Sequence, residues 1–388
     1  MELLEKVARP RAVGTVLNDE ITDYIGAYLE DSGYEVNKIP FDCKVWKAKE
    51  SFLLIDGNRV IVQVSPYSEA FIGTRKTITV RSLEELEKAE CEDKLLFLTE
   101  ELSEEGLQPK NYPFYYPKEH KAVIDCLEEK KPCAIIAVTG RSSMSGLEPF
   151  PVIEDGNFHI PIGSISKECF AEIEATVQEK EVEVSFFSKN SEVIAHQLIA
   201  SKKVPNPQGT IVICAHMDSK YNTDGALDNA SGVVTMLLAA KGIETDKYNI
   251  DIVPFNSEEY YEPKGELIYL DEIQKSGKEI KLLVNIDTVA HAGSKVAVAS
   301  FNFDEKEQER IDKVMEECEN VVVGEPWYAG DHTAFAFNGT KCVLISASDL
   351  FEDCVYYTHC PKDTVDLVDR GLIENAAEYI CKVVNSYL

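Results

Sequence analysis

The chain has 388 residues, of which 44% are hydrophobic, so it can bury a large core and is too long for one compact domain. Its formal net charge of −29 argues against a nucleic-acid-binding protein, because such proteins need clustered positive charge. We therefore expect an acidic protein of two domains.

Eleven cysteines are scattered along the chain and include no Cys-x-x-Cys pair. This distribution argues against a cysteine zinc site and indicates reduced thiols in a cytoplasmic protein. The N-terminal segment has no apolar stretch of the kind that marks a secretory signal, and no run approaches the roughly 18 apolar residues of a transmembrane helix. We therefore expect a cytoplasmic protein that does not associate with a membrane.

The first predicted element is a helix over residues 17–33, where apolar side chains recur at helical spacing. Asn18 or Asp19 would cap its start and Gly33 would end it, before a strand that begins near Tyr34. From about residue 46 to 188, short apolar runs alternate with turns, which predicts a β-rich module. Its expected elements are strands at 52–55, 60–64, 94–99, 133–138 and 182–187 and a helix at 119–129.

From about residue 189 onward the pattern becomes strand, loop, helix. The expected strands are 193–200, 210–215, 249–255, 280–286 and 341–347. The expected helices are 230–243, 264–275, 304–318 and 369–386. This alternation predicts a three-layer α/β/α fold in which helices cover both faces of a mostly parallel central sheet.

Five side chains stand at or just beyond the ends of predicted strands, or in the loops that follow: His216, Asp228, Glu259, Asp287 and His359. In open α/β sheets, the carboxyl ends of the strands are where sites form. An apolar strand that ends in a carboxylate places a charge against a dry interior, which is unfavourable unless a partner or a metal neutralises it. The five residues are therefore candidate metal ligands.

Two histidines with three carboxylates suit zinc, since imidazole nitrogen and carboxylate oxygen are ordinary zinc ligands. Five ligands exceed the needs of one tetrahedral site, but they can hold two metals about 3.5–4 Å apart if one carboxylate bridges. Asp228 is the candidate bridge, because its loop lies between the other ligands in the sequence. Two Zn²⁺ ions are thus the expected cofactors.

Two further carboxylates adjoin these ligands. Glu258 precedes Glu259 and could act as the general base that takes a proton from an activated water molecule. Asp218 follows His216 by two residues and is placed to orient its imidazole. Both are therefore candidate catalytic residues rather than ligands.

Together these residues resemble the co-catalytic zinc aminopeptidases of clan MH. Those enzymes carry His-x-Asp-Ser, then Gly-Ala-x-Asp-Asn-x-Ser-Gly, Glu-Glu, Asp, and a late His before Pro-x-Asp-Thr. The similar segments of this chain, in the same order, are His216–Ser219, Gly225–Gly232, Glu258–Glu259, Asn285–Asp287 and His359–Thr364. The resemblance covers roughly residues 1–45 and 189–388.

The resemblance implies two zinc sites, with His216 and Asp287 on one metal, Glu259 and His359 on the other, and Asp228 as the bridge. It also implies that Glu258 is the general base and that Asp218 orients His216. A cis peptide bond would precede Asn229, as it does in the family.

Three residues are candidate substrate contacts. His332 lies in Gly330–Phe335, which is similar to the family's Ser-Asp-His-Thr-x-Phe loop, and it would contact the substrate or the oxyanion. Tyr260 and Tyr261 would line the pocket, although large aromatic side chains usually just pack. They stand where the family commonly has a Gly-Leu-x-Gly-Ser stretch, so the pocket of this chain departs from the family pattern.

The middle block, residues 46–188, resembles a protease-associated domain inserted into the peptidase. Its tract 161–166, just before a helix near Lys167, is similar to the end of such modules. The resemblance therefore implies a discontinuous zinc exopeptidase domain of the phosphorylase/hydrolase-like type, over 1–45 and 189–388, interrupted by this insertion.

The expected function is a di-zinc aminopeptidase that hydrolyses the N-terminal peptide bond of peptides with a free N-terminus. A homo-oligomer is also compatible with the sequence. Three alternatives stay open: a carboxypeptidase or dipeptidase on the same scaffold, a glutaminyl cyclase, and a non-catalytic binding protein. The first would need a basic group in the pocket, for which Lys220 and Lys264 are near the ligands in sequence.

Overall fold

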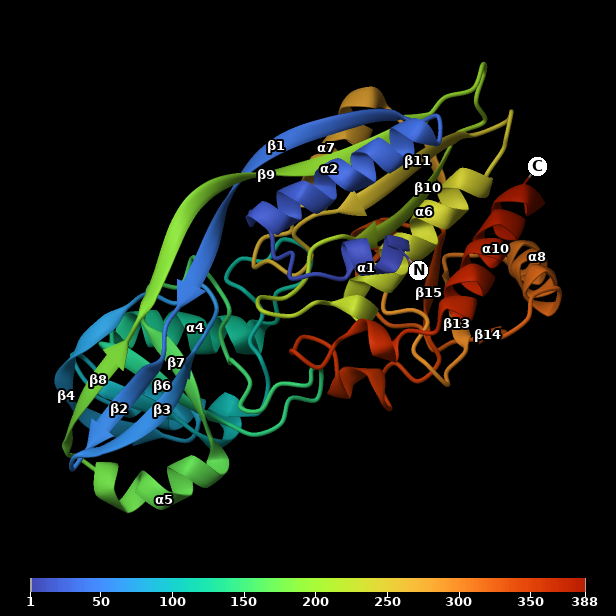
Figure 1. Cartoon of the computed structure of the whole chain (residues 1–388). Helices are drawn as coiled ribbons and strands as arrows, with labels where there is room; N and C mark the ends of the chain where they lie inside the picture. Colours follow the sequence, from blue (N-terminus) through green and yellow to red (C-terminus); the bar gives the residue numbers. More distant parts are fainter. Residues whose placement is uncertain (1, 388) are drawn as a thin grey trace. The chain divides into compact units, whose positions relative to one another are not determined.

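The computed structural model describes residues 2–387, which divide into two units (Figure 1). The first unit contains the chain up to Cys43 and again from Ile194 onward, and the second contains Lys44–Val193. The boundaries fall within two long strands, β1 (Glu35–Ala48) and β9 (Ser188–Lys202). No helix in residues 2–387 has the length and apolar character needed to span a bilayer.

The first unit is built on an eight-stranded sheet with the order β1-β9-β11-β10-β12-β15-β13-β14. Four neighbouring strands run parallel: β10 (Thr210–His216), β11 (Asn249–Phe255), β12 (Ile280–Ile286) and β15 (Cys342–Ala347). β9 and β13 (Val296–Phe301) join this group antiparallel, and β14 (Val321–Val323) pairs with β13. Because parallel strands end at one edge, the residues that follow them come together there.

Helices cover both faces of the sheet. One face packs on α1 (Glu2–Val7), α2 (Val16–Asp31), α6 (Gly232–Gly242), α8 (Glu305–Glu316) and α10 (Arg370–Ser386). The other face packs on α7 (Lys264–Ser276) and α9 (Thr333–Ala336), where the rings of Phe255, Tyr269 and Phe335 contact one another. The predicted α/β fold with helices on both faces is therefore confirmed.

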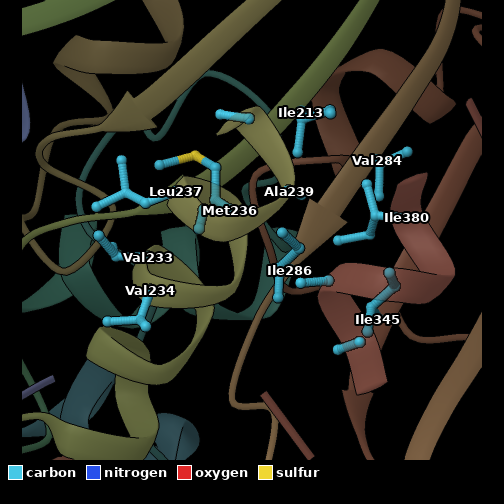
Figure 2. Packing of buried hydrophobic residues seen from close by; sticks show 14 of the residues in the cluster. Ile213, Val233, Val234, Met236, Leu237, Ala239, Val284, Ile286, Ile345 and Ile380 are labelled. Carbon is cyan, nitrogen blue, oxygen red and sulfur yellow. The ribbon is translucent and has the colours of Figure 1, made fainter. Parts of the chain in front are cut away.

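The core of the first unit lies between the central strands and the helices α6 and α10. Figure 2 shows Ile213, Val284 and Ile345 of the strands close to Met236 of α6 and Ile380 of α10. Their neighbours along the strands, such as Val212 and Leu344, are also apolar and buried, because helices cover the opposite face of the sheet as well. The buried face holds the strands in register, and so it places their ends at one edge of the sheet.

The start of α2 differs from the prediction. Its N-cap is Thr15, whose hydroxyl oxygen accepts a hydrogen bond from the backbone N–H of Asn18. Neither Asn18 nor Asp19 caps the helix, because the Asn18 side chain is buried and bonds to Asn256 instead. Gly33 follows the helix with a φ of +87°, a conformation that glycine adopts without strain, before β1 begins.

The strands of the first unit agree with the predicted ones, but β13 and β14 were not predicted. β13 reads Val-Ala-Val-Ala-Ser-Phe, and its alternate alanines give it no polar alternation and little of the bulk typical of a strand. β14 has only three residues. β13 is stabilised by its pairing with β15 rather than by its own sequence. This pairing is antiparallel, so β13 and β14 run opposite to the four central strands.

The second unit is a closed barrel of seven strands in the order β2-β3-β7-β6-β5-β4-β8. These strands are β2 (Ser51–Ile55), β3 (Asn58–Val64), β4 (Phe71–Val80), β5 (Leu95–Leu98), β6 (Ala134–Thr139), β7 (Ile162–Ser166) and β8 (Glu181–Phe186). Its helices are α3 (Leu83–Lys88), α4 (Lys118–Lys130) and α5 (Lys167–Val177). β4 and β7 were not predicted. The assignment of this unit as a protease-associated domain stays a prediction.

All eleven cysteines lie within the described residues and are free. Six of them are buried, among them Cys214 on β10 and Cys354 in the loop after β15. They form no disulfide in residues 2–387. The cytoplasmic location of the protein stays a prediction.

Candidate metal centre

The structure brings all five candidate ligands together at the carboxyl edge of the four parallel strands. His216 ends β10, Asp287 follows β12, Glu259 follows β11, His359 lies in the loop after β15, and Asp228 lies between β10 and α6. They form two groups with ligand atoms within 4.8 Å of one another. One group is His216, Asp228 and Asp287, and the other is Asp228, Glu259 and His359.

Asp228 belongs to both groups because its two oxygens face different histidines. Its Oδ1 lies 2.9 Å from His216 Nε2, and its Oδ2 lies 2.9 Å from His359 Nε2. The other carboxylate of each group lies slightly farther from the histidine of that group. Asp287 Oδ1 is 3.7 Å from His216 Nε2, and Glu259 Oε1 is 3.3 Å from His359 Nε2.

The turn that carries Asp228 is irregular. It lies in a π-helical turn, Ala226–Ser231, in which Asp228 and Asn229 have non-helical backbone angles. The peptide bond between them is cis, which confirms the expectation from the resemblance. Asn229 is fully buried, and its side-chain amide donates to the carbonyl of Ile286 at the end of β12. The Asp228 turn is thus tied to the strand that ends in Asp287.

Asp363 holds the same turn from the other side. Its two oxygens accept hydrogen bonds from the backbone N–H groups of Leu227 (2.7 Å) and Asp228 (3.1 Å). Burial raises the pKa of Asp363 to about 7, against the effect of these bonds. Asp363 stands four residues after His359, so one short segment connects two of the three ligands of the second group, His359 and Asp228.

Three residues at or beside the ligands have strained backbones. Ser257, Thr288 and His359 have φ values of +111°, +49° and +60°, which side chains other than glycine adopt rarely. Ser257 precedes Glu258 and Thr288 follows Asp287. His359 is itself a candidate ligand. Such strain persists only where the surroundings enforce it, and it is concentrated at functional sites.

Asp218 has a different contact from the predicted one. Its Oδ1 lies 3.8 Å from His216 Nδ1, beyond hydrogen-bonding distance, and Nδ1 has no hydrogen-bond partner in residues 2–387. Instead, its oxygens accept the backbone N–H groups of Glu258 (3.2 Å) and Glu259 (3.1 Å). Asp218 therefore positions the general-base candidate and a ligand through their backbone.

The histidines and carboxylates perturb one another strongly. Burial lowers the pKa of His216, but Glu258, Asp228 and Asp287 outweigh it, so the pKa lies well above its usual value. For His359 the facing carboxylates also outweigh burial and raise the pKa to about 9. Burial opposes the charge on Asp228, yet the two histidines lower its pKa below its ordinary value. Without metal, both imidazoles are thus protonated, and their positive charge offsets the negative charge of the neighbouring carboxylates.

The donor set fits two zinc ions. Nitrogen and carboxylate oxygen are zinc donors, and each group offers three of them, as catalytic zinc sites do. Glu259 Oε1 is buried and accepts no hydrogen bond from residues 2–387, and the nearby His359 Nε2, at 3.3 Å, belongs to the same ligand group. Divalent cations would replace the imidazole protons, because metal binding requires neutral histidine.

Glu258 is partly buried beside the two groups. Burial is the largest cause that raises its pKa well above the ordinary value, and the charges of Glu259 and Asp287 add to it, while His216 opposes them. Its place next to the ligands agrees with the role predicted from the sequence.

The three predicted substrate contacts are mostly occupied by internal contacts. His332 is buried, its Nε2 lies 2.9 Å from the Trp327 carbonyl, and its Nδ1 lies 3.2 Å from the Asn285 side-chain amide. Since a carbonyl only accepts, Nε2 carries the proton and Nδ1 accepts from Asn285. Tyr260 and Tyr261 are buried against each other, with 2.7 Å between their hydroxyl oxygens. Their substrate role stays a prediction.

Arg11 is a supporting residue that sequence reasoning missed. It is fully buried, and its guanidinium donates to the carbonyls of Met217 (2.6 Å), Asp224 (2.5 Å) and Gly225 (2.9 Å). Burial lowers its pKa to about 10, so it stays charged at neutral pH. Arg11 therefore fastens the N-terminal segment to the loop between two ligands, His216 and Asp228.

We expect Arg11→Ala to lower the free energy of unfolding by about 3–5 kcal/mol. The variant would leave several buried carbonyls without the guanidinium that now donates hydrogen bonds to them. Arg11→Lys should cost less, since it keeps the charge but not the fork of donors. Urea denaturation of both variants checks this. A loss below 1 kcal/mol for Arg11→Ala would contradict the bracing role.

Glu266 and Asp331 form a second buried pair of carboxyls next to the site. They are 2% and 3% exposed, and their side chains can hydrogen-bond to each other only while one carboxyl keeps its proton. Burial raises the pKa of Glu266 to about 7, and burial together with Glu266 raises the pKa of Asp331 well above its usual value. The pair is therefore destabilising once both groups lose their protons.

The zinc-free protein should lose stability as the pH rises from 4.5, the ordinary pKa of Glu266, to about 7. In this window the unfolded chain releases the Glu266 proton while the folded chain retains it, which costs about 3 kcal/mol. Glu266→Gln should therefore be more stable than the parent protein at pH 8, with the difference vanishing towards pH 4.5. Thermal melts at both pH values, with half-exposed Glu272→Gln on the same helix as control, test this. Equal melting temperatures at pH 8 would refute it.

Comparisons with known proteins agree with this site. Residues 197–384 match peptidase family M28, whereas no curated protein matches the chain. An aminopeptidase from Aneurinibacillus sp. strain AM-1 has a TM-score of 0.76 at 18% identity, over 99% of this chain and 92% of that one. A zinc aminopeptidase from Bacillus subtilis has a TM-score of 0.74 at 18% identity, over 100% and 94%. A peptidase M28 precursor from Shewanella amazonensis has a TM-score of 0.70 at 20% identity, over 100% and 90%.

At such low identity these structures establish the fold alone. The match in sequence spans the unit that carries the candidate ligands, from β9 to α10, and it includes all five of them. The clan MH resemblance of the sequence, the three-layer fold and the family match agree with one another. Residues 197–384 of the chain, which carry all five candidate ligands, thus match peptidase family M28.

Proposed function

We propose that the chain is a zinc-dependent aminopeptidase that removes the N-terminal residue of peptides. The observation that carries the proposal is Asp228, whose two oxygens face His216 and His359 at 2.9 Å each. One carboxylate shared by two ligand groups is what a two-metal site requires. The peptidase family and the zinc aminopeptidase of the same fold support the metal and the reaction class.

Bound zinc would polarise the scissile carbonyl and lower the pKa of the attacking water. His216 and Asp287 would hold one ion, Glu259 and His359 the other, and Asp228 both. Glu258 acts as the general base: it accepts a proton from the attacking water and passes it to the leaving amine. Asp218 keeps Glu258 in place through the backbone N–H that it binds.

The charge of the site favours a substrate with a free amino group. Four carboxylates converge there: Asp228, Glu258, Glu259 and Asp287. Two zinc ions would balance this charge, but carboxylate oxygens that do not bind metal would still accept hydrogen bonds from an ammonium group of the substrate. This supports cleavage at the N-terminal end.

One cation at the site favours a second candidate, a carboxypeptidase or dipeptidase. Lys220 Nζ lies 3.5 Å from Glu259 Oε2, so it could bind a substrate carboxylate. Lys264, the other lysine considered, pairs with Glu262 at 2.6 Å. A single lysine that already faces a candidate ligand is outweighed by the four carboxylates, so we rank this function second.

The proposal is tested by hydrolysis of matched free and N-acetylated aminoacyl anilides, with zinc and after chelation. We expect cleavage of the free-amine substrates only, lost on chelation and restored by zinc. Dipeptides and C-terminally free peptides with a blocked N-terminus test the second candidate. Cleavage of the blocked peptides, or cleavage that survives chelation, would overturn the aminopeptidase assignment.

A further inference from the structure

A separate cluster of metal-binding side chains lies in the first unit. The ligand atoms of His291, Asp349 and Cys354 all lie within 4.8 Å of one another. His291 Nδ1 is 2.8 Å from Asp349 Oδ2, and Cys354 Sγ is 3.4 Å from Asp349 Oδ1. A second carboxylate oxygen, Asp353 Oδ2, is 3.9 Å from His291 Nε2. We propose that His291, Asp349 and Cys354 bind a third zinc ion, in addition to the pair at Asp228.

The donor types suit zinc. A thiolate, an imidazole and a carboxylate are its three ordinary ligand classes, and thiolate does not favour magnesium or calcium. Tetrahedral zinc keeps its ligand atoms roughly 3.3–3.8 Å apart. The contact between Cys354 and Asp349 already falls in this range, while the His291–Asp349 hydrogen bond would lengthen by roughly 0.5 Å. Asp353 lies beside the other imidazole nitrogen, Nε2, so a water molecule rather than Asp353 would complete the tetrahedron.

The charges around the cluster also favour a cation. His291 and Cys354 are buried, at 5% and 0% exposure, whereas Asp353 is half-exposed and provides a path from solvent. Two carboxylates face one imidazole, and no lysine or arginine among residues 2–387 forms an ion pair with either. A divalent ion at this place would balance the partly exposed carboxylate of Asp349 and the thiolate of the buried Cys354, whose proton would pass to solvent.

The position of the cluster suggests a structural role. His291 lies four residues after Asp287 and pairs with Val368 in an isolated β-bridge. Asp349 and Cys354 lie between β15 and His359, on the segment that leads to this ligand. A zinc ion here would tie the loop that follows one candidate ligand to the loop that presents another. The third ion would thus stabilise the catalytic loops without touching the substrate.

The test compares the parent protein with Cys354→Ser and with the matched control Cys360→Ser. Cys360 is a buried neighbour whose thiol donates to the Tyr357 carbonyl and is not in the cluster. After dialysis against metal-free buffer, mass spectrometry should find one zinc fewer per chain in Cys354→Ser than in the other two. Substitution with Co²⁺ should give a thiolate charge-transfer band in the parent and in Cys360→Ser, and no such band in Cys354→Ser.

The cobalt band reports this site alone, because the five ligands of the catalytic pair include no sulfur. It should therefore persist in Asp228→Asn, whatever happens to the catalytic pair and to activity. If Cys354→Ser fails to fold, Asp349→Asn provides the second variant with the same expected losses. Absence of the band from the parent protein, or equal zinc content in all variants, would overturn the proposal.

Discussion

Glu258→Gln should keep its zinc and lose turnover by at least about 10²–10⁴-fold, the usual contribution of a positioned general base. The amide has nearly the shape of the carboxyl but cannot accept the proton of the attacking water. Zinc should remain, because Glu258 belongs to neither ligand group. The loss should appear in kcat more than in KM, since proton transfer acts on the chemical step. Steady-state kinetics and zinc analysis of one preparation measure both quantities.

A matched control is Glu309→Gln, which makes the same change on an exposed position of α8. This control should retain the parent rate. If Glu258→Gln kept the parent kcat, Glu258 would not be the base. If it lost zinc along with activity, the residue would be a ligand rather than a base.

Asp228→Asn should abolish activity and weaken both zinc ions together. Asp228 is the only residue shared by the two groups, and an amide offers neither the charge nor two oxygen ligands. The loss of zinc affinity should exceed the roughly 10–100-fold that outer-shell changes cost. Competition with a chromogenic chelator measures the affinity, and anilide hydrolysis measures the rate.

The number of zinc ions that each variant loses shows whether Asp228 binds both ions or only one. His359→Ala should lose chiefly one zinc ion, whereas Asp228→Asn should affect both. Asp246→Asn, an exposed position before β11, is the control for the same change of charge. If Asp228→Asn kept one ion at parent affinity, Asp228 would not be shared.

The candidate ligands were predictable because each has a local signal. His216 and Asp287 end apolar runs that could only be buried strands, and neighbouring parallel strands end at one edge. The resemblance then assigned roles that the spacing alone left open. The sheet, with β11-β10-β12-β15 as neighbours, supplies the physical reason that these distant residues converge.

The supporting residues could not be predicted in the same way. Arg11 binds backbone carbonyls more than 200 residues away. Because every residue has a backbone carbonyl, the sequence does not mark which ones Arg11 binds. His291 and Asp349 are 58 residues apart and match no ligand spacing, so only the fold brings them together. Asp218 was predicted as a partner of His216, but its acceptor oxygens lie closer to two backbone N–H groups, which a sequence does not display.

The most direct measurement is anomalous diffraction at the zinc edge from crystals of the zinc-loaded protein. The account predicts two peaks about 3.5–4 Å apart on either side of the Asp228 carboxylate, one beside His216 and one beside His359, besides the separate peak proposed at Cys354. A single peak at this carboxylate, or none, would contradict the claim that Asp228 joins two zinc sites.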